Sequence, residues 1–226
     1  MALDNVSLNK FLNLLRSPRD RRIAMIRRDA RTSVLKEKFD AKSEDRDFYS
    51  TFWADAKKAV FMGADLDDLT RERIEKSRSR FRLFPILRDG FLMAWDNYTG
   101  QILGDSEKIE QLRNISGAWS PNDVDGKIRV GNLLALKDIN DLRHLVFPYF
   151  SQLYALGPRA ASLGLWTLRD VLKVHQTETI TIFDVLHGEI YSDVDIVPTG
   201  SEKDELSERY RAFLREWLTQ KRIFSR

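Results

Sequence analysis

The chain has 226 residues, of which 42% are hydrophobic and 11% aromatic, so it can bury a core and is not disordered throughout. It contains no cysteine, which excludes disulfides, thiolate catalysis and sulfur-ligated metals and is typical of a reducing compartment. The first 88 residues hold 21 Lys and Arg against 14 Asp and Glu, whereas the remainder holds 16 against 20, which predicts an anionic partner for the first part or a contact between the two parts.

Four helices are predicted in the first part of the chain. The first is short, and its apolar stripe consists of Leu8, Phe11, Leu12 and Leu15. A second should run from Pro18 to about Phe39, because Ser17, Pro18 and Asp20 form a typical helix start. Its inward stripe consists of Ile23, Ile26, Ala30 and Val34. The third and fourth helices are predicted at Asp47–Met62 and from Leu66 to about Phe81.

A change to β-structure is predicted after Phe81. Phe84–Arg88 and Phe91–Trp95 flank Asp89-Gly90, a pair that accepts the positive φ angles of a tight hairpin turn. Gln101–Leu103 is expected to add a strand. Farther along, a short helix around Ser106–Arg113 and a strand at Lys127–Val130 are predicted among loops.

The last part of the chain returns to helix. One helix is expected from about Ile139 to Leu156, kinked at Pro148, and Gly157-Pro158 ends it and begins the next. A second hairpin, Thr179–Val185 with Glu189–Val197, is centred on His187-Gly188. A long C-terminal helix then begins at the capping pair Ser201 and Asp204. Its apolar side consists of Leu206, Tyr210, Phe213, Leu214, Trp217 and Leu218.

These elements predict an α+β protein, mostly helical, with a small antiparallel sheet built from the two tight hairpins. We expect a basic helical section at 1–81, a small β-rich section at 82–132 and a helical section with a hairpin at 133–226. The three sections can share one continuous core.

A membrane protein is not expected. The longest apolar run, Leu145–Phe150, has six residues and includes a proline, far short of the roughly 20 that span a bilayer. The first fifteen residues carry Asp4 and Lys10 within their apolar stretch, unlike a signal peptide. We therefore expect a cytoplasmic protein.

Two basic segments are candidates for nucleic-acid contact. On the second helix, Arg21, Arg28 and Lys36 should lie opposite the apolar stripe, where they could neutralise phosphates. The alternative is a solvated helix face or an arginine-rich subunit contact. The second candidate segment is Arg71–Arg88, because single strands use arginines near aromatic rings and basic residues here interleave with Phe81 and Phe84. Its seven basic residues are Arg71, Arg73, Lys76, Arg78, Arg80, Arg82 and Arg88, of which Arg78, Arg80 and Arg82 are the candidate contacts. The alternative there is that both rings belong to the core.

An acidic hairpin is the candidate metal site. With His187-Gly188 as the two central turn residues, Ile182 faces Asp193, so Asp184, Asp193 and Asp195 share one face. Three carboxylates on a strand pair could hold Mg²⁺ or Mn²⁺ for phosphoryl transfer. Residues 192–196 resemble the Asp-x-Asp strand of nucleotidyltransferases over five residues, but no Gly-Ser pair precedes them as in that family. The alternative is a solvated acidic strand face.

Other catalytic signatures are absent from the sequence. It has no glycine-rich phosphate loop and no G-x-S-x-G, and its three histidines lie too far apart to form a local zinc site. We therefore expect no cofactor and a non-enzymatic subunit of a larger assembly, whose basic N-terminal face contacts nucleic acid or an acidic protein. The alternatives are a protein-only or immunity-type module, and a metal-dependent nuclease or nucleotidyltransferase that uses the acidic hairpin.

Overall fold

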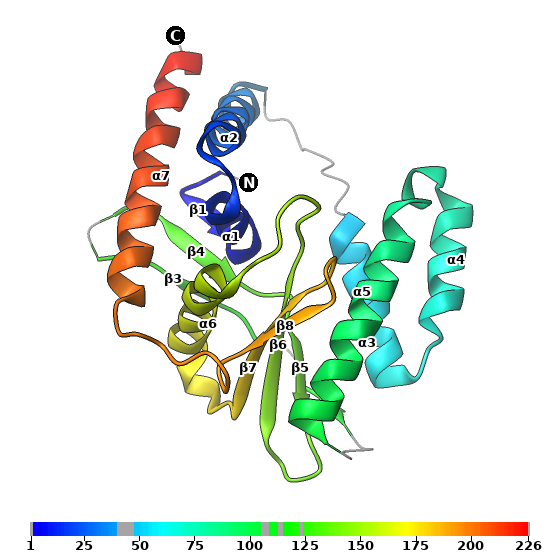
Figure 1. Ribbon diagram of the computed structural model, residues 1–226. Helices are drawn as coiled ribbons and strands as arrows, with labels where there is room; N and C mark the ends of the chain where they lie inside the picture. Colours follow the sequence, from blue (N-terminus) through cyan, green and yellow to red (C-terminus); the bar gives the residue numbers. More distant parts are fainter. Residues whose placement is uncertain (1, 40–47, 105–108, 113–114, 123, 226) are drawn as a thin grey trace.

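The computed structural model describes residues 2–39, 48–104, 109–112, 115–122 and 124–225 (Figure 1). Within them the chain forms an α+β fold with a mixed sheet of five strands and a mixed sheet of three. Helices cover both faces of the larger sheet, which lies in the middle of the molecule (Figure 1). None of the helices in the described residues is long and apolar enough to cross a membrane.

The larger sheet has the strand order β2-β5-β6-β7-β8. These strands are β2 (Glu110–Gln111), β5 (Leu134–Lys137), β6 (Arg143–Tyr149), β7 (Thr179–Asp184) and β8 (Glu189–Ser192). β6 and β7 are parallel, and the crossover between them contains α6 (Pro158–Leu172). The other neighbours are antiparallel. The carboxyl ends of β6 and β7 therefore meet at one end of the sheet, the place where α/β folds commonly bind ligands.

One face of this sheet is covered by four helices and the small sheet (Figure 1). The helices are α1 (Leu8–Arg16), α2 (Arg19–Phe39), α6 and α7 (Glu202–Ser225). The small sheet has the order β1-β4-β3, formed by β1 (Asn5–Ser7), β4 (Lys127–Val130) and β3 (Gly117–Trp119). The inward side of α7 consists of Leu206, Tyr210, Phe213, Leu214 and Trp217, as predicted, whereas Leu218 is exposed.

The other face is covered by a helical layer of α3 (Phe48–Met62), α4 (Leu66–Lys76) and α5 (Leu83–Tyr98). The 3₁₀ helix η1 (Arg78–Arg80) precedes α5 and the π-helix η2 (Thr99–Leu103) follows it, and the 3₁₀ helix η3 (Lys173–His175) follows α6. The predicted helices 47–62 and 66–81 are confirmed as α3 and α4, although α4 ends five residues early. Gly63, at φ +65°, follows α3 in the left-handed conformation that ends helices.

The predicted hairpin at Asp89-Gly90 is wrong, because residues 83–98 form the helix α5. Its buried side chains recur at helical spacing: Phe84, Leu87, Phe91, Ala94 and Tyr98. Gly90 serves close packing instead of a turn, since a Cβ atom there would lie 2.0 Å from the carbonyl oxygen of Val185. Gln101–Leu103, predicted as a strand, continues the helix as η2.

The predicted helix from Ile139 to Leu156 is also wrong, because its centre is the strand β6. A strand buried on both faces has a continuous apolar sequence without polar alternation, and helical spacing can be found in such a run. Pro148 is tolerated because β5 pairs only as far as Val146, so β6 has one neighbour at that point. Half of the predicted helix at Ser106–Arg113 lies outside the described residues, and the described half contains the strand β2.

The predicted small antiparallel sheet is therefore corrected to two mixed sheets. The hairpin of β7 and β8 exists, but four residues, 185–188, connect its strands, and Ile182 pairs with Tyr191 instead of Asp193. The helix starts at Pro158 and at Ser201 are confirmed to within a residue. At the C-terminal helix, however, the capping side chain is that of Glu202, which accepts the N–H groups of Thr199 and Gly200, both at 2.9 Å.

Candidate functional site

The outer face of α2 is basic. Ile26, Ala30 and Val34 are buried, which turns the opposite face of the helix outward. Arg21 and Arg28 are exposed on that face, as predicted, and Lys36 is half-buried. Arg31, which sequence reasoning did not select, is also exposed and lies three residues beyond Arg28. Arg21, Arg28 and Arg31 are named the α2 arginine face below.

No described carboxylate of α2 forms an ion pair with this face, although Asp20 in the first turn of α2 is also exposed. Asp29 is buried and pairs with Lys10 of α1. Glu37 accepts from Lys221 of α7 at 2.6 Å, and this hydrogen bond lowers the pKa of Glu37. The three arginines of the face make no ion pair within the described residues. The described surroundings therefore leave their charge available to an external anion.

The second basic segment has fewer side chains available to contact nucleic acid than its sequence indicates. Arg78 and Arg82 are exposed near the α4–α5 junction, and the side chain of Arg80 lies outside the described part. Phe84 is buried, but Phe81 is 64% exposed, so only one of the two rings belongs to the core. Other basic residues of the segment are held by carboxylates: Arg71 by Asp68, Lys76 by Glu72, and Arg88 by Asp67 and Asp89.

Arg73 has a structural partner. It donates to both carboxylate oxygens of Asp55, at 2.8 and 3.0 Å, and Asp55 is buried on α3. Burial alone raises the pKa of Asp55, but hydrogen bonds from Arg73 and Lys58 outweigh it, so the net effect is a lowered pKa. This ion pair joins α3 to α4, so Arg73 is not available to bind a ligand.

The acidic hairpin does not bring its three candidate metal ligands together. Asp184 is fully buried, Asp193 pairs with Arg169 and accepts the N–H of Ile180 at 2.9 Å, and Asp195 is exposed in the turn after β8. The observed register and the end of β8 at Ser192 separate the three carboxylates. Across the part of the chain that is described, no group of three His, Asp or Glu side chains could hold a metal ion. The prediction that these carboxylates share one face is therefore wrong.

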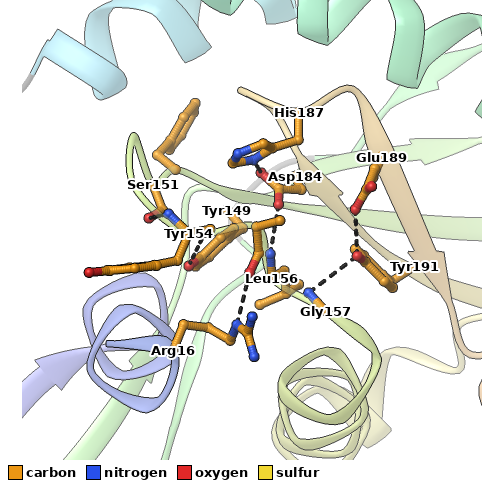
Figure 2. Close-up of polar contacts among 12 residues, drawn as sticks. Arg16, Tyr149, Ser151, Tyr154, Leu156, Gly157, Asp184, His187, Glu189 and Tyr191 are labelled. Carbon is orange, nitrogen blue, oxygen red and sulfur yellow. Dashed lines mark hydrogen bonds and ion pairs between the residues drawn. The ribbon is translucent and has the colours of Figure 1, made fainter. Parts of the chain in front are cut away.

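Asp184 instead forms a buried pair with a histidine, shown in Figure 2. The Nδ1 atom of His187 lies 2.8 Å from Oδ1 of Asp184, and Oδ2 accepts the N–H of Leu156 at 2.8 Å. Burial raises the pKa of Asp184, and the contacts with His187 and Leu156 only partly offset this effect. Each oxygen of Asp184 thus has a partner, and the pair ties the loop after β6 to the turn after β7.

Neighbouring contacts close the same end of the sheet (Figure 2). Arg16 of α1 donates to the carbonyl oxygen of Ala155 at 2.8 Å. The hydroxyl of Tyr191 accepts the N–H of Gly157 at 3.2 Å and donates to Glu189 at 2.6 Å. Burial is the main cause that raises the pKa of Tyr191 to about 12, so this hydroxyl stays protonated and can donate. A carboxylate-oriented histidine could act as a base. The contacts of this cluster instead join the loop after β6 to the turn after β7 and to α1.

Sequence reasoning also missed a cleft of about 700 Å³ between the small sheet and the starts of α1 and α3. Among the described residues that line it, the cations are Lys127 and Arg129 of β4. The alternation of basic and apolar residues in Lys-Ile-Arg-Val was the available signal, because it places both cations on one strand face. Comparisons of the chain with protein-family models, curated proteins and solved structures found no match.

Proposed function

We propose that the protein is a non-enzymatic subunit of a larger assembly that contacts nucleic acid through the α2 arginine face. The observation that supports this proposal is the exposure of Arg21, Arg28 and Arg31 without an ion-pair partner in the described chain. Basic residues elsewhere, such as Arg73 and Arg169, are bound to carboxylates of the protein itself. The α2 arginine face is therefore the surface best suited to an external polyanion.

The spacing on α2 suits a phosphate backbone. Ten residues separate Arg21 from Arg31, roughly 15 Å along a helix axis. A nucleic-acid strand of that length carries several phosphates, and arginine recognises phosphate oxygens with a fixed fork of donors. None of these contacts reads bases, so the proposed binding does not depend on sequence.

The experiment is a mobility-shift titration with a short DNA duplex and a short single-stranded RNA at several salt concentrations. The parent should bind one of them with an affinity that falls steeply with salt, because cations on the protein displace counterions. Replacing Arg21, Arg28 and Arg31 together with Glu should abolish binding. Individual replacements with Gln should each lower the slope of log affinity against log salt by about 0.7–0.9.

A matched control is the replacement of Arg71, Lys76 and Lys173 with Glu, which changes net charge equally at exposed cations already paired with neighbours. This variant should keep most of its affinity. Equal loss in both triple variants would mean that only net charge matters, and undiminished binding by the α2 variant would refute the proposal. The alternative is a module that binds only protein. It would be favoured if both triple variants bound a protein partner with an affinity that does not change with salt.

A further inference from the structure

The cleft beside β4 has the features of a small-molecule site. Its volume of about 700 Å³ lies within the range of ligand pockets, roughly 300–1,000 Å³. It is bounded by the outer face of the small sheet, the first turn of α1, the start of α3 and the end of β6. No residue of the α2 arginine face lines it, so it is a separate site.

The strand pattern of β4 explains why cations line this cleft. Ile128 and Val130 are buried in the core beneath the small sheet. Lys127 and Arg129 alternate with them and so belong to the opposite face. On that face Arg129 is paired with Ser7 of β1 on one side and Ala118 of β3 on the other. Ala118, whose side chain is small, also lines the cleft.

Charge and hydrogen-bond donors favour an anion. The described residues that line the cleft include Lys127 and Arg129 but no Asp or Glu. Lys127 makes no ion pair in the described chain, and a guanidinium has five N–H donors, so Arg129 can bind an anion while it keeps other contacts. The first turn of α1, which Ser7 caps, also borders the cleft and adds the positive end of a helix dipole.

Part of the remaining wall is aromatic and apolar. Tyr49 of α3 stacks on Phe150 with ring centroids 4.7 Å apart and an interplanar angle of 12°. Phe147 and Pro148 of β6 continue this wall. A ligand that matches both parts of the cleft combines a phosphate with a planar ring.

We propose that this cleft binds a nucleoside monophosphate, with the phosphate at Lys127 and Arg129 and the base on the side of Tyr49. Titration calorimetry with AMP is the test, with adenosine and ribose 5-phosphate as partial ligands. AMP should bind with a micromolar Kd, and each partial ligand should bind at least tenfold more weakly, because each lacks one of the two recognised groups.

Two variants locate the binding. Lys127→Gln should weaken AMP binding at least tenfold, and Ala118→Glu should abolish it by adding a negative charge beside Arg129. Both positions are exposed, so the melting temperature should not change. Lys203→Gln, at an exposed lysine on α7, is the control and should bind like the parent. The α2 variant with three glutamates should also bind AMP normally, which separates this site from the proposed nucleic-acid surface.

Three results would overturn the proposal: no AMP binding at millimolar concentration, unchanged binding in both cleft variants, or equal affinity for AMP and ribose 5-phosphate. A nucleic-acid strand with a 5′ phosphate ends in a nucleoside 5′-phosphate, the same class of group that AMP presents. If a 5′-phosphorylated trinucleotide competes with AMP, the cleft can bind the end of a nucleic-acid strand. If it does not compete, the ligand of the cleft is the free nucleotide.

Discussion

Glu202 shows how a single buried carboxylate can organise a helix start. It is fully buried at the first position of α7. Its oxygens accept two backbone N–H groups and the hydroxyls of Thr199 and Ser162, at 2.8 and 3.0 Å. Burial alone raises its pKa, but the hydrogen bonds from Thr199 and Ser162 outweigh burial and lower the pKa of Glu202 to about 2. The charged form is therefore the one that stabilises the fold.

A pH-dependent stability follows from this lowered pKa. Stability from Glu202 is fully present above its unfolded pKa of 4.5 and is lost as pH falls toward about 2. Glu202→Gln should lower the free energy of unfolding by about 3 kcal/mol at pH 7. The NH₂ group of the glutamine would face N–H and O–H groups that also donate, so their hydrogen bonds to the carboxylate would be lost. In urea unfolding, this cost should shrink at pH 3. Asp204→Asn, in the same turn but exposed, should cost less than about 1 kcal/mol. An equal cost of Glu202→Gln at both pH values would contradict the role of the charge.

At the residue scale, the sequence predicts which side chains are exposed better than it predicts which residues they pair with. The helical period correctly placed Arg21 and Arg28 outside, because it follows directly from the buried stripe of α2. It could not reveal that Arg73 is bound to Asp55, eighteen residues away on another helix. Nor could it reveal that Arg169 of α6 pairs with Asp193 after β8. Such partners depend on how elements pack, so the charge runs of the sequence overstated the free basic and acidic surfaces.

At the scale of elements, two segments were predicted with the wrong type of secondary structure, and the two errors have related causes. Asp89-Gly90 has the composition of a hairpin turn, but the apolar residues around it fit a helix, and the glycine is required by contact with the end of β7. Conversely, Leu145–Phe150 fits helical spacing, but these residues lie in or beside a strand with core on both sides. In each case tertiary packing decides between two locally acceptable conformations.

Gly90 provides a test of this packing. Gly90→Ala should destabilise the protein by roughly 2–3 kcal/mol, because its Cβ would lie 2.0 Å from the Val185 carbonyl oxygen and α5 would have to move. Gly100→Ala is the matched control, since no atom lies within 4 Å of its Cβ and alanine is the better helix former. It should stabilise by about 0.5–1 kcal/mol. Urea unfolding measures both, and a gain in both variants would show that α5 does not approach β7 this closely.

At the scale of the whole molecule, one sheet separates two cores and belongs to both. Along β6, Leu145, Phe147 and Tyr149 pack into the core beneath α1, α6 and α7, whereas Val146 packs into the core beneath α3 and α5. Distant parts of the chain also meet: β1 pairs with β4, and the side chain of Asn9 accepts the N–H of Phe150 at 2.8 Å. The sequence offered no sign of these contacts, because they join segments over a hundred residues apart.

These shared contacts predict one cooperative unfolding transition for the sections 1–81, 82–132 and 133–226 together. Leu168→Ala in the first core and Leu87→Ala in the second, both fully buried, should each cost about 2–5 kcal/mol. In urea, circular dichroism and tryptophan fluorescence should shift together in both variants and keep the slope of the parent. Separate transitions, with Leu87→Ala lowering only one of them, would instead mean that the helical layer of α3, α4 and α5 unfolds independently. The sheet argues against that outcome, because exposing one of its faces would leave β6 covered on a single side and remove the packing that makes its apolar sequence stable as a strand.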